Sequence, residues 1–377
     1  MRRKSVFLLP VIALFVLLGN AAYAAADGDD VPIIPNLPVS PALSVSTVPA
    51  NGDVNPYGVA FVPRGFPNGG LLKHGDIVVS NFNASSNLQG TGTTIVRIGA
   101  DGTQSLFFQG AAVGLSTALG VLKRGFVIVG NLPSTDGSGS CVAESGPNAN
   151  VGQGSLIILN RHGKVVKTLT SEEFLNGPWD LTIRDEGERA QVFVSNALSG
   201  TVSRIDLKIR DEDDRGGDRI VVEKETQIGS GYTHRCDPAA FVVGPTGLAL
   251  DEKTDTLYVA ATGDNSIFAL RDASDTHHDQ GTGKLIVSDP VHMHGPLALA
   301  RAENGDLISS QGDAVNPDPN HVSEIVEYTA KGQFVAQFQV DPGAGAAFGL
   351  ALRSTEDGFI FAAVDDGVNV LDVWIVH

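Results

Sequence analysis

A short two-strand unit recurs six times along the sequence and constrains the fold more than any other feature. Each copy has a turn containing Gly or Pro, an apolar strand, a polar turn, and a second apolar strand ending near Asn, Asp or Gly. The copies begin at Pro56, Thr117, Gly177, Gly244, Gly295 and Ala347. Such repetition is typical of architectures in which one supersecondary unit packs against the next. We therefore expect the 377 residues to form one repeated domain, although length alone suggests two.

Each unit continues into two further strand-like runs, for example residues 94–98 and 104–108. Short β-branched runs separated by Gly or Asp-Gly turns favour hairpins. Six four-stranded units averaging about 56 residues over residues 42–377 predict an all-β, six-bladed β-propeller with antiparallel blades. A many-stranded β-sandwich is the alternative fold.

The sixth unit ends with its third strand, so one strand of its blade is missing. Residues 42–48 alternate apolar and polar side chains and precede the first repeat. We expect them to pair on the outside of the last blade, which would close the ring and remove an open edge. The propeller then spans residues 42–377, and residues 25–41 form an irregular lead-in.

The N-terminus has the pattern of an export signal. Arg2, Arg3 and Lys4 precede an apolar run over residues 6–18, and small residues follow up to Ala24. This pattern predicts a signal peptide over residues 1–24 that is cleaved near Ala24. The run of about 13 residues is shorter than the roughly 20 that span a bilayer. The mature protein is expected in the periplasm or outside the cell, without a membrane span.

Composition narrows the function classes. The formal charge is −17, and nucleic-acid recognition needs clustered Lys and Arg, so no nucleic-acid partner is expected. A hydrophobic content of 42% excludes a disordered chain. The sequence also lacks the G-x-S-x-G, H-E-x-x-H, phosphate-loop and dinucleotide-binding motifs.

The fourth unit carries a resemblance to known propellers. The run Gly-Pro-Thr-Gly-Leu-Ala-Leu-Asp251, followed by residues 255–270, resembles an NHL-type propeller repeat. The broader group includes gluconolactonase-like and streptogramin-lyase-like propellers, and the resemblance implies an exported bacterial member. It covers nearly all of the mature chain, but its motif is structural. Members include lactonases, lyases and binding modules, so the resemblance leaves the function open.

Blade topology sorts the loops onto two faces. Strands A to D run outward and alternate in direction, so the B–C and D–A loops share one face. The long insertions lie at residues 81–93, 131–154, 229–244, 288–295 and 311–323, and all belong to that face. We call it the long-loop face. Long loops on a rigid scaffold usually carry binding, so we expect a small molecule or a protein partner there.

Polar residues follow the second strand of each unit on this face: Asn81, Asn131, Asn196, Asp264, Asp313 and Asp365. Asp180 is expected at the mouth of the channel. A ring of oxygen donors suits a hard cation such as calcium, and the resemblance implies a divalent ion in such a ring. The metal-binding glutamate of gluconolactonase-like relatives has no evident counterpart here. Alternatively, these side chains cap the turns that end the strands.

Histidines also gather in the loops of this face, among them His234, His294 and His321. Imidazole is a common ligand of zinc and copper. The sequence resembles a propeller lyase that binds zinc through histidines from several blades, and only His294 comes close to that position. Tyr232 and Arg235 are candidates for a general base and an anion contact, with Asp180 as a third catalytic candidate. The alternative is a set of solvated loop histidines.

Cys141 and Cys236 both lie in loops of the long-loop face. Because an exported chain enters an oxidising compartment, we predict a disulfide between them.

Two functions remain open at this point. The first is an exported NHL-type propeller that binds a small ligand or a protein partner on the long-loop face, with no assigned catalysis. The second is a metal-dependent hydrolase or lyase, lactonase-like or zinc-lyase-like, with its site at the channel mouth on the same face. Calcium or zinc would be its cofactor.

Overall fold

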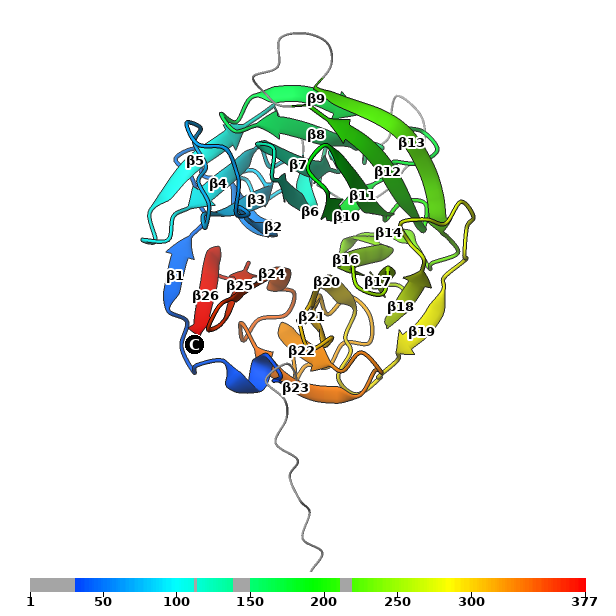
Figure 1. Cartoon of the computed structure of the whole chain (residues 1–377). Coiled ribbons are helices and arrows are strands. Elements are labelled where there is room, and N and C mark those ends of the chain that lie inside the picture. The colour runs from blue at the N-terminus through cyan, green and yellow to red at the C-terminus, as the bar shows by residue number, and fades with distance from the viewer. Residues whose placement is uncertain (1–30, 112–113, 138–149, 211–218) are drawn as a thin grey trace, which may run out of the picture.

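The computed structural model describes residues 31–111, 114–137, 150–210 and 219–377. Within these residues the chain forms six four-stranded antiparallel sheets, which surround one axis as the blades of a propeller (Figure 1). The helical content described there is one short 3₁₀ helix, η1 (Ile34–Asn36). The predicted six-bladed β-propeller is therefore confirmed. No helix in the described part of the chain is long and apolar enough to cross a membrane.

In the first three blades the strands run outward from the axis in chain order. Blade 1 contains β2 (Val54–Phe61), β3 (Ile77–Asn83), β4 (Thr94–Ile98) and β5 (Gln104–Gln109). Blade 2 contains β6 (Leu115–Leu122), β7 (Phe126–Asn131), β8 (Ser155–Asn160) and β9 (Val165–Leu169). Blade 3 contains β10 (Pro178–Asp185), β11 (Arg189–Asn196), β12 (Thr201–Ile209) and β13 (Ile220–Gly229).

Blades 4 and 5 repeat this order, and blade 6 modifies it. Blade 4 contains β16 (Pro245–Asp251), β17 (Thr256–Ala261), β18 (Ser266–Arg271) and β19 (Lys284–Val287). Blade 5 contains β20 (Pro296–Arg301), β21 (Leu307–Gln311), β22 (Glu324–Tyr328) and β23 (Phe334–Gln339). Blade 6 contains β24 (Ala347–Thr355), β25 (Gly358–Asp365), β26 (Val370–Val376) and, on its outside, β1 (Leu43–Ser46). A separate hairpin of β14 (Arg235–Asp237) and β15 (Phe241–Val243) lies between blades 3 and 4.

The ring closes through β1, as the sequence predicts. β1 pairs antiparallel with β26, so that Leu43 lies opposite Val373 and Val45 opposite Leu371. The two strands lie side by side although they come from opposite ends of the propeller sequence (Figure 1). Leu43 and Val45 also pack against the apolar cluster between blades 6 and 1. The N-terminal strand therefore contributes both backbone pairing and packing to the last blade.

The segment before β1 docks on blade 5. The backbone N–H groups of Ile33 and Ile34 each donate to the carboxylate of Glu327, at 2.7 Å. Both isoleucines are buried in the apolar cluster between blades 5 and 6. Burial raises the pKa of Glu327 to about 7, and the two N–H donors oppose this shift.

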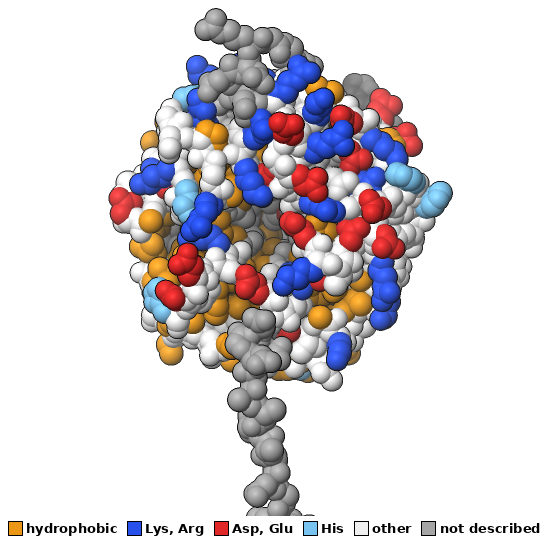
Figure 2. All heavy atoms as spheres, viewed as in Figure 1, with side chains coloured by type: hydrophobic (Ala, Val, Ile, Leu, Met, Phe, Trp, Pro, Cys, Tyr) orange, Lys and Arg blue, Asp and Glu red, His pale blue; other side chains and the backbone are white. Residues whose placement is uncertain are grey.

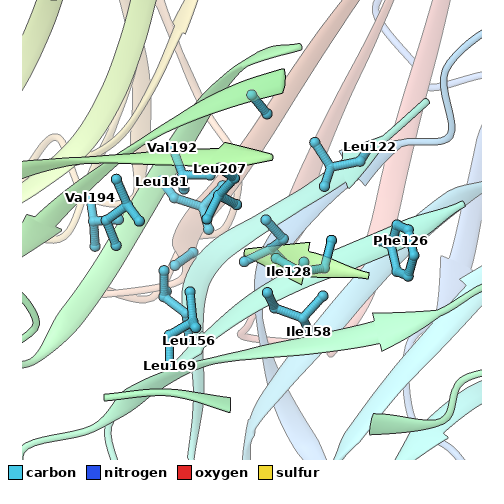
Figure 3. Close-up of a cluster of buried hydrophobic side chains, with 14 of the residues drawn as sticks. Leu122, Phe126, Ile128, Leu156, Ile158, Leu169, Leu181, Val192, Val194 and Leu207 are labelled. Atoms are coloured by element: carbon cyan, nitrogen blue, oxygen red, sulfur yellow. The ribbon is translucent and has the colours of Figure 1, made fainter. Parts of the chain in front are cut away.

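Apolar faces of neighbouring blades form the core. Between blades 2 and 3, for example, Leu122, Phe126 and Ile128 face side chains such as Val192 and Leu207 (Figure 3). Burial of such surface stabilises a fold by roughly 25 cal/mol per Å². Each blade packs mainly on its two neighbours, and the last blade packs on the first, so apolar clusters follow one another around the ring.

Every innermost strand has a register shift near its start. The shifts fall between Pro56 and Val59, Leu115 and Leu119, Pro178 and Leu181, Pro245 and Leu248, Pro296 and Leu299, and Ala347 and Leu350. A bulge leaves backbone groups without ladder partners. Side-chain hydroxyls replace several of these partners.

In blades 1 and 3, a hydroxyl joins the bulge to the next blade. Ser80 Oγ accepts from Gly58 N–H at 2.9 Å and donates to the carbonyl of Ser116 in blade 2, at 3.0 Å. Ser195 Oγ accepts from Asp180 N–H at 3.0 Å and donates to the carbonyl of Thr246 in blade 4, at 2.6 Å. A Cβ on Gly58 would lie 2.7 Å from Ser80 Oγ, so this position requires glycine.

Removal of β1 is expected to weaken the whole ring. A chain that begins at Thr47 loses the pairing with β26 and the packing of Leu43 and Val45. We expect it to unfold with a free energy about 2–4 kcal/mol lower than a chain that begins at Ala42. Urea denaturation of the two chains measures the difference. Equal urea midpoints would show that the pairing of β1 with β26 does not stabilise the propeller.

Candidate functional site

A pocket of about 380 Å³ opens among the loops of the long-loop face. The loop between β3 and β4 contributes Gln89, and the hairpin region contributes Ala239, Ala240 and Val242. Its principal side chains are Asn55, Tyr57, Trp179, Asp313, Phe348 and Asp366. We call it the mouth pocket. The predicted clustering of B–C and D–A loops on one face is visible in this lining.

Aromatic rings form one wall of the mouth pocket. Tyr57 is stacked between Phe82 and Phe348, with ring centroids 4.5 and 4.2 Å away. Trp179 meets Tyr57 edge-on at 5.7 Å. Phe241, from β15, meets Phe82 edge-on at 5.3 Å and extends the cluster. Rings in such mutual contact are rigid and offer an apolar surface at low entropic cost.

Trp179 has an unsatisfied donor in this wall. Its side chain is 1% exposed, and its indole Nε1 has no hydrogen-bond partner among the described residues. A buried donor without a partner costs about 1–3 kcal/mol. An acceptor on a bound molecule would satisfy it.

Carboxylates form the other side of the pocket. Burial, together with the nearby charges of Asp365 and Asp341, raises the pKa of Asp366 to about 7. The amide of Asn55, oriented to donate, lies 3.0 and 3.1 Å from the two carboxylate oxygens of Asp366. Burial and the charge of Asp366 also raise the pKa of Tyr57.

Asp313 supplies the second carboxylate of the pocket. Its Oδ2 accepts from the N–H groups of Ser323, at 3.0 Å, and Gly345, at 2.8 Å. Its Oδ1 is buried without a partner among the described residues. The described lining contains no Lys, Arg or His. The mouth pocket is therefore electronegative as well as aromatic.

The polar residues at the second-strand ends mostly bond within their own blades. Asn81 donates to Thr94 Oγ1 at 3.2 Å, and Asn131 Oδ1 accepts from Ser155 Oγ at 2.6 Å. Asn196 Nδ2 donates to Ser203 Oγ at 3.1 Å. These partners lie on the third strand of each blade, so the amides point away from the axis and cap the B–C loops.

The pairing of the first and second strands shows that the six predicted oxygen donors do not all hold equivalent positions. Residues Asn81, Asn131, Asn196 and Asp365 occupy equivalent positions, but Ala261 and Gln311 hold that position in blades 4 and 5. Asp264 and Asp313 lie further along their loops, and Asp264 accepts from both the N–H and the hydroxyl of Thr233. Of the six predicted oxygen donors, Asp313 alone lines the mouth pocket.

The candidate histidines make separate contacts. His234 is exposed, with Nδ1 3.0 Å from the carbonyl of Tyr232. His294 is buried against Glu324, at 3.2 Å, and the exposed His321 contacts Asp318 at 2.8 Å. Within the described parts of the chain, no three His, Cys, Asp or Glu side chains gather as a metal site. A zinc or calcium site stays a prediction.

The remaining candidates lie around β14. Tyr232 is buried and donates to the carbonyl of Thr282 at 3.2 Å, whereas Arg235 is exposed and pairs with Asp237. Cys236 lies in β14, and Cys141 lies outside the described residues. The predicted disulfide is therefore not tested.

Asp180 lies inside the channel and not at the long-loop mouth where we expected it. Its carboxylate accepts from the N–H groups of Leu181, at 2.8 Å, and of Leu248 in the next blade, at 2.9 Å. Burial raises the pKa of Asp180 to about 7 in spite of these bonds. The residue lines a second pocket at the other end of the channel. Asp180 lies within the bulge between Pro178 and Leu181, which turns its side chain away from the mouth.

Comparison with known proteins supports the fold. No family model matches the sequence, and no curated protein matches it. Among solved structures, a gluconolactonase from Xanthomonas campestris is 13% identical with a TM-score of 0.52, covering 89% of this chain and 96% of that chain. Regucalcin, a calcium-binding protein from Agrobacterium tumefaciens, is 12% identical with a TM-score of 0.50, covering 88% and 93%. Virginiamycin B lyase from Staphylococcus aureus is 13% identical with a TM-score of 0.48, covering 89% and 99%.

The gluconolactonase and regucalcin structures confirm the resemblance at the level of the fold. At such identities they carry no residue roles, and the NHL-type repeat and export stay predictions. The sequence reasoning missed the aromatic wall of the mouth pocket. Its signal was present, because Tyr57, Trp179 and Phe348 occupy the same position in their repeats. Each directly follows the inner-strand residue that pairs with Asn81, Asn196 or Asp365.

Asp180 gives the stability a defined pH dependence. Its pKa is about 7 in the folded state, above the ordinary value of an aspartate. At a pH between the ordinary aspartate pKa and 7, Asp180 is protonated in the folded chain and ionised in the unfolded chain. Protonation of Asp180 therefore stabilises the folded state fully in acid, and this contribution is lost as the pH rises through 7. Relative to Asp180→Asn, the wild type should lose about 1 kcal/mol per pH unit in this window. Urea denaturation of both proteins at several pH values from 5 to 8 measures it. A constant difference would contradict the prediction.

Proposed function

We propose that the protein binds a small organic cation in the mouth pocket, with no assigned catalysis. The observation that carries this proposal is the pairing of stacked aromatic rings with two carboxylates in a lining without a basic side chain among its described residues. A cation over an aromatic face is attracted by the ring quadrupole, more strongly where water is excluded. A carboxylate at the same site adds a charge-assisted hydrogen bond.

The titration of Asp366 supports a cation in particular. Its pKa of about 7 reflects burial beside other acidic groups, so Asp366 is partly protonated near neutral pH. A bound cation favours the ionised form and would lower this pKa. Binding should therefore release a proton and become tighter as the pH rises from 6 to 8.

We also propose that the protein is exported and that its partner is a small molecule. The N-terminal pattern supports export with cleavage near Ala24, and the acidic composition supports a small-molecule partner over a nucleic acid. A metal-dependent hydrolase or lyase is the alternative function. Stoichiometric calcium or zinc in the purified protein, found by elemental analysis, would favour that alternative.

Phenethylamine is the probe for the proposed site. The chain has two tryptophans, and Trp374 lies in β26, so a Trp374→Phe background makes Trp179 the fluorescent reporter of the pocket. We expect phenethylamine to change this fluorescence and to bind more tightly than the neutral 2-phenylethanol. Asp366→Asn should weaken phenethylamine binding roughly tenfold, the order of one charge-assisted hydrogen bond.

A matched control separates local from general charge effects. Asp357→Asn removes the same charge from the exposed turn between β24 and β25 of the same blade, outside the mouth pocket. It should leave phenethylamine binding unchanged. Equal binding of the amine and the alcohol, or equal weakening by the two substitutions, would overturn the proposal.

The proposed disulfide has its own test. Cys141 and Cys236 are the two cysteines of the chain, and export would oxidise them. We expect the protein purified from an oxidising compartment to resist thiol alkylation until it is reduced, with a mass 2 Da lower than the dithiol form. Two alkylatable thiols before reduction would exclude the disulfide.

A further inference from the structure

A second cavity lies in the other half of the channel and does not depend on the function proposed for the mouth pocket. This axial pocket measures about 460 Å³ and is lined by all six innermost strands. The residue after each bulge is leucine in five blades and Val59 in blade 1, and all six line the pocket. We call these six residues the leucine ring. Figure 2 shows a hollow at the centre of the ring with hydrophobic side chains inside it and charged groups around it. Such a wall favours an aliphatic chain over water.

One position in this wall carries a positive charge where the other blades are apolar. Two residues beyond the leucine ring, the register places Phe61, Val121, Ile183, Leu250 and Leu352, and in blade 5 it places Arg301. Arg301 pairs with Asp251 through Nη2 at 3.0 Å. Its Nε is buried and has no hydrogen-bond partner among the described residues.

A second arginine lies on the neighbouring strand and lacks such a pair. Arg353 follows Leu352 in β24 and lines the pocket, with its guanidinium carbon 4.8 Å from the ring centroid of Phe61. Its Nη1 is buried without a hydrogen-bond partner in the part of the chain that the structure describes. Burial lowers the pKa of Arg353. A partly desolvated cation without an anion costs free energy that a bound anion would recover.

We propose that the axial pocket binds a small aliphatic carboxylate, whose head contacts Arg353 and Arg301 and whose hydrocarbon chain lies along the leucine ring. A guanidinium donates two parallel N–H bonds to a carboxylate, which suits the unpartnered Nη1 of Arg353. Asp251 already balances Arg301, and burial raises the pKa of Asp180, the carboxylate in the lining, to about 7, so that it is partly protonated near neutral pH. A single negative charge on the ligand then balances Arg353. The aliphatic side chains of the wall contact the hydrocarbon chain of the ligand.

Calorimetric titration of the full chain with octanoate tests the proposal. We expect one equivalent of octanoate to bind, octanol and acetate to bind at least tenfold more weakly, and octylamine not to bind. Arg353→Gln should weaken octanoate binding roughly tenfold or more, the order of a lost charge-assisted pair of bonds. Thermal melting of this variant should stay close to wild type, since Arg353 has no ion pair within the described residues.

Arg184→Gln is the matched control. Arg184 holds the equivalent place on β10, but it pairs with Glu186 and does not line the axial pocket. It should leave octanoate binding unchanged, and so should Asp366→Asn in the mouth pocket, even if the mouth pocket binds no amine. Octanoate that binds no better than octanol, or equally to Arg353→Gln and wild type, would overturn the proposal. If Arg353→Gln fails to fold, the comparison of octanoate, octanol and octylamine on the wild type decides.

Discussion

The ring depends on hydroxyl side chains that satisfy the bulged backbone of its innermost strands. A bulge near the axis buries peptide groups that the sheet ladder cannot pair, and each such group costs about 1–3 kcal/mol if left alone. Ser80 and Ser195, on the second strands of blades 1 and 3, accept an N–H of their own inner strand and donate to a carbonyl of the next blade. One hydroxyl thus completes a bulge and joins two blades. Ser116 and Thr246 extend these links through their own hydroxyls to the carbonyls of Pro178 and Pro296.

The same bulges divide the channel into two pockets. Trp179 lines the mouth pocket and the next residue, Asp180, lines the axial pocket. Leu297 and Ala298 in blade 5 show the same alternation. Without a bulge, successive strand residues would face the two neighbouring blades in strict turn. The register shift instead directs adjacent residues toward opposite ends of the axis, so one structural device supports the ring and separates its two cavities.

The sequence predicted the architecture because the repeat is a backbone property. Strand lengths, turns and the missing last strand were all readable, and β1 lies where the alternation of residues 42–48 placed it. The sites were harder to predict, because they depend on the direction of individual side chains. Asn81 lies near the end of β3, and its amide turns outward to Thr94. Asp180 was expected at the mouth, and the bulge beside it reverses that expectation.

The two pockets differ in charge in a way that the composition conceals. Asp313 and Asp366 make the mouth pocket electronegative. The axial pocket contains Arg353 without an ion pair, Arg301 paired with Asp251, and Asp180, whose pKa burial raises to about 7. The formal charge of −17 would suggest that cations are favoured everywhere on this protein. Solvent and salt screen most of that charge over about 8–10 Å, whereas a buried group acts on a ligand in contact with it. Ligand preference at each end of the channel therefore follows from the few charged groups that line its pocket, and the net charge mainly governs solubility.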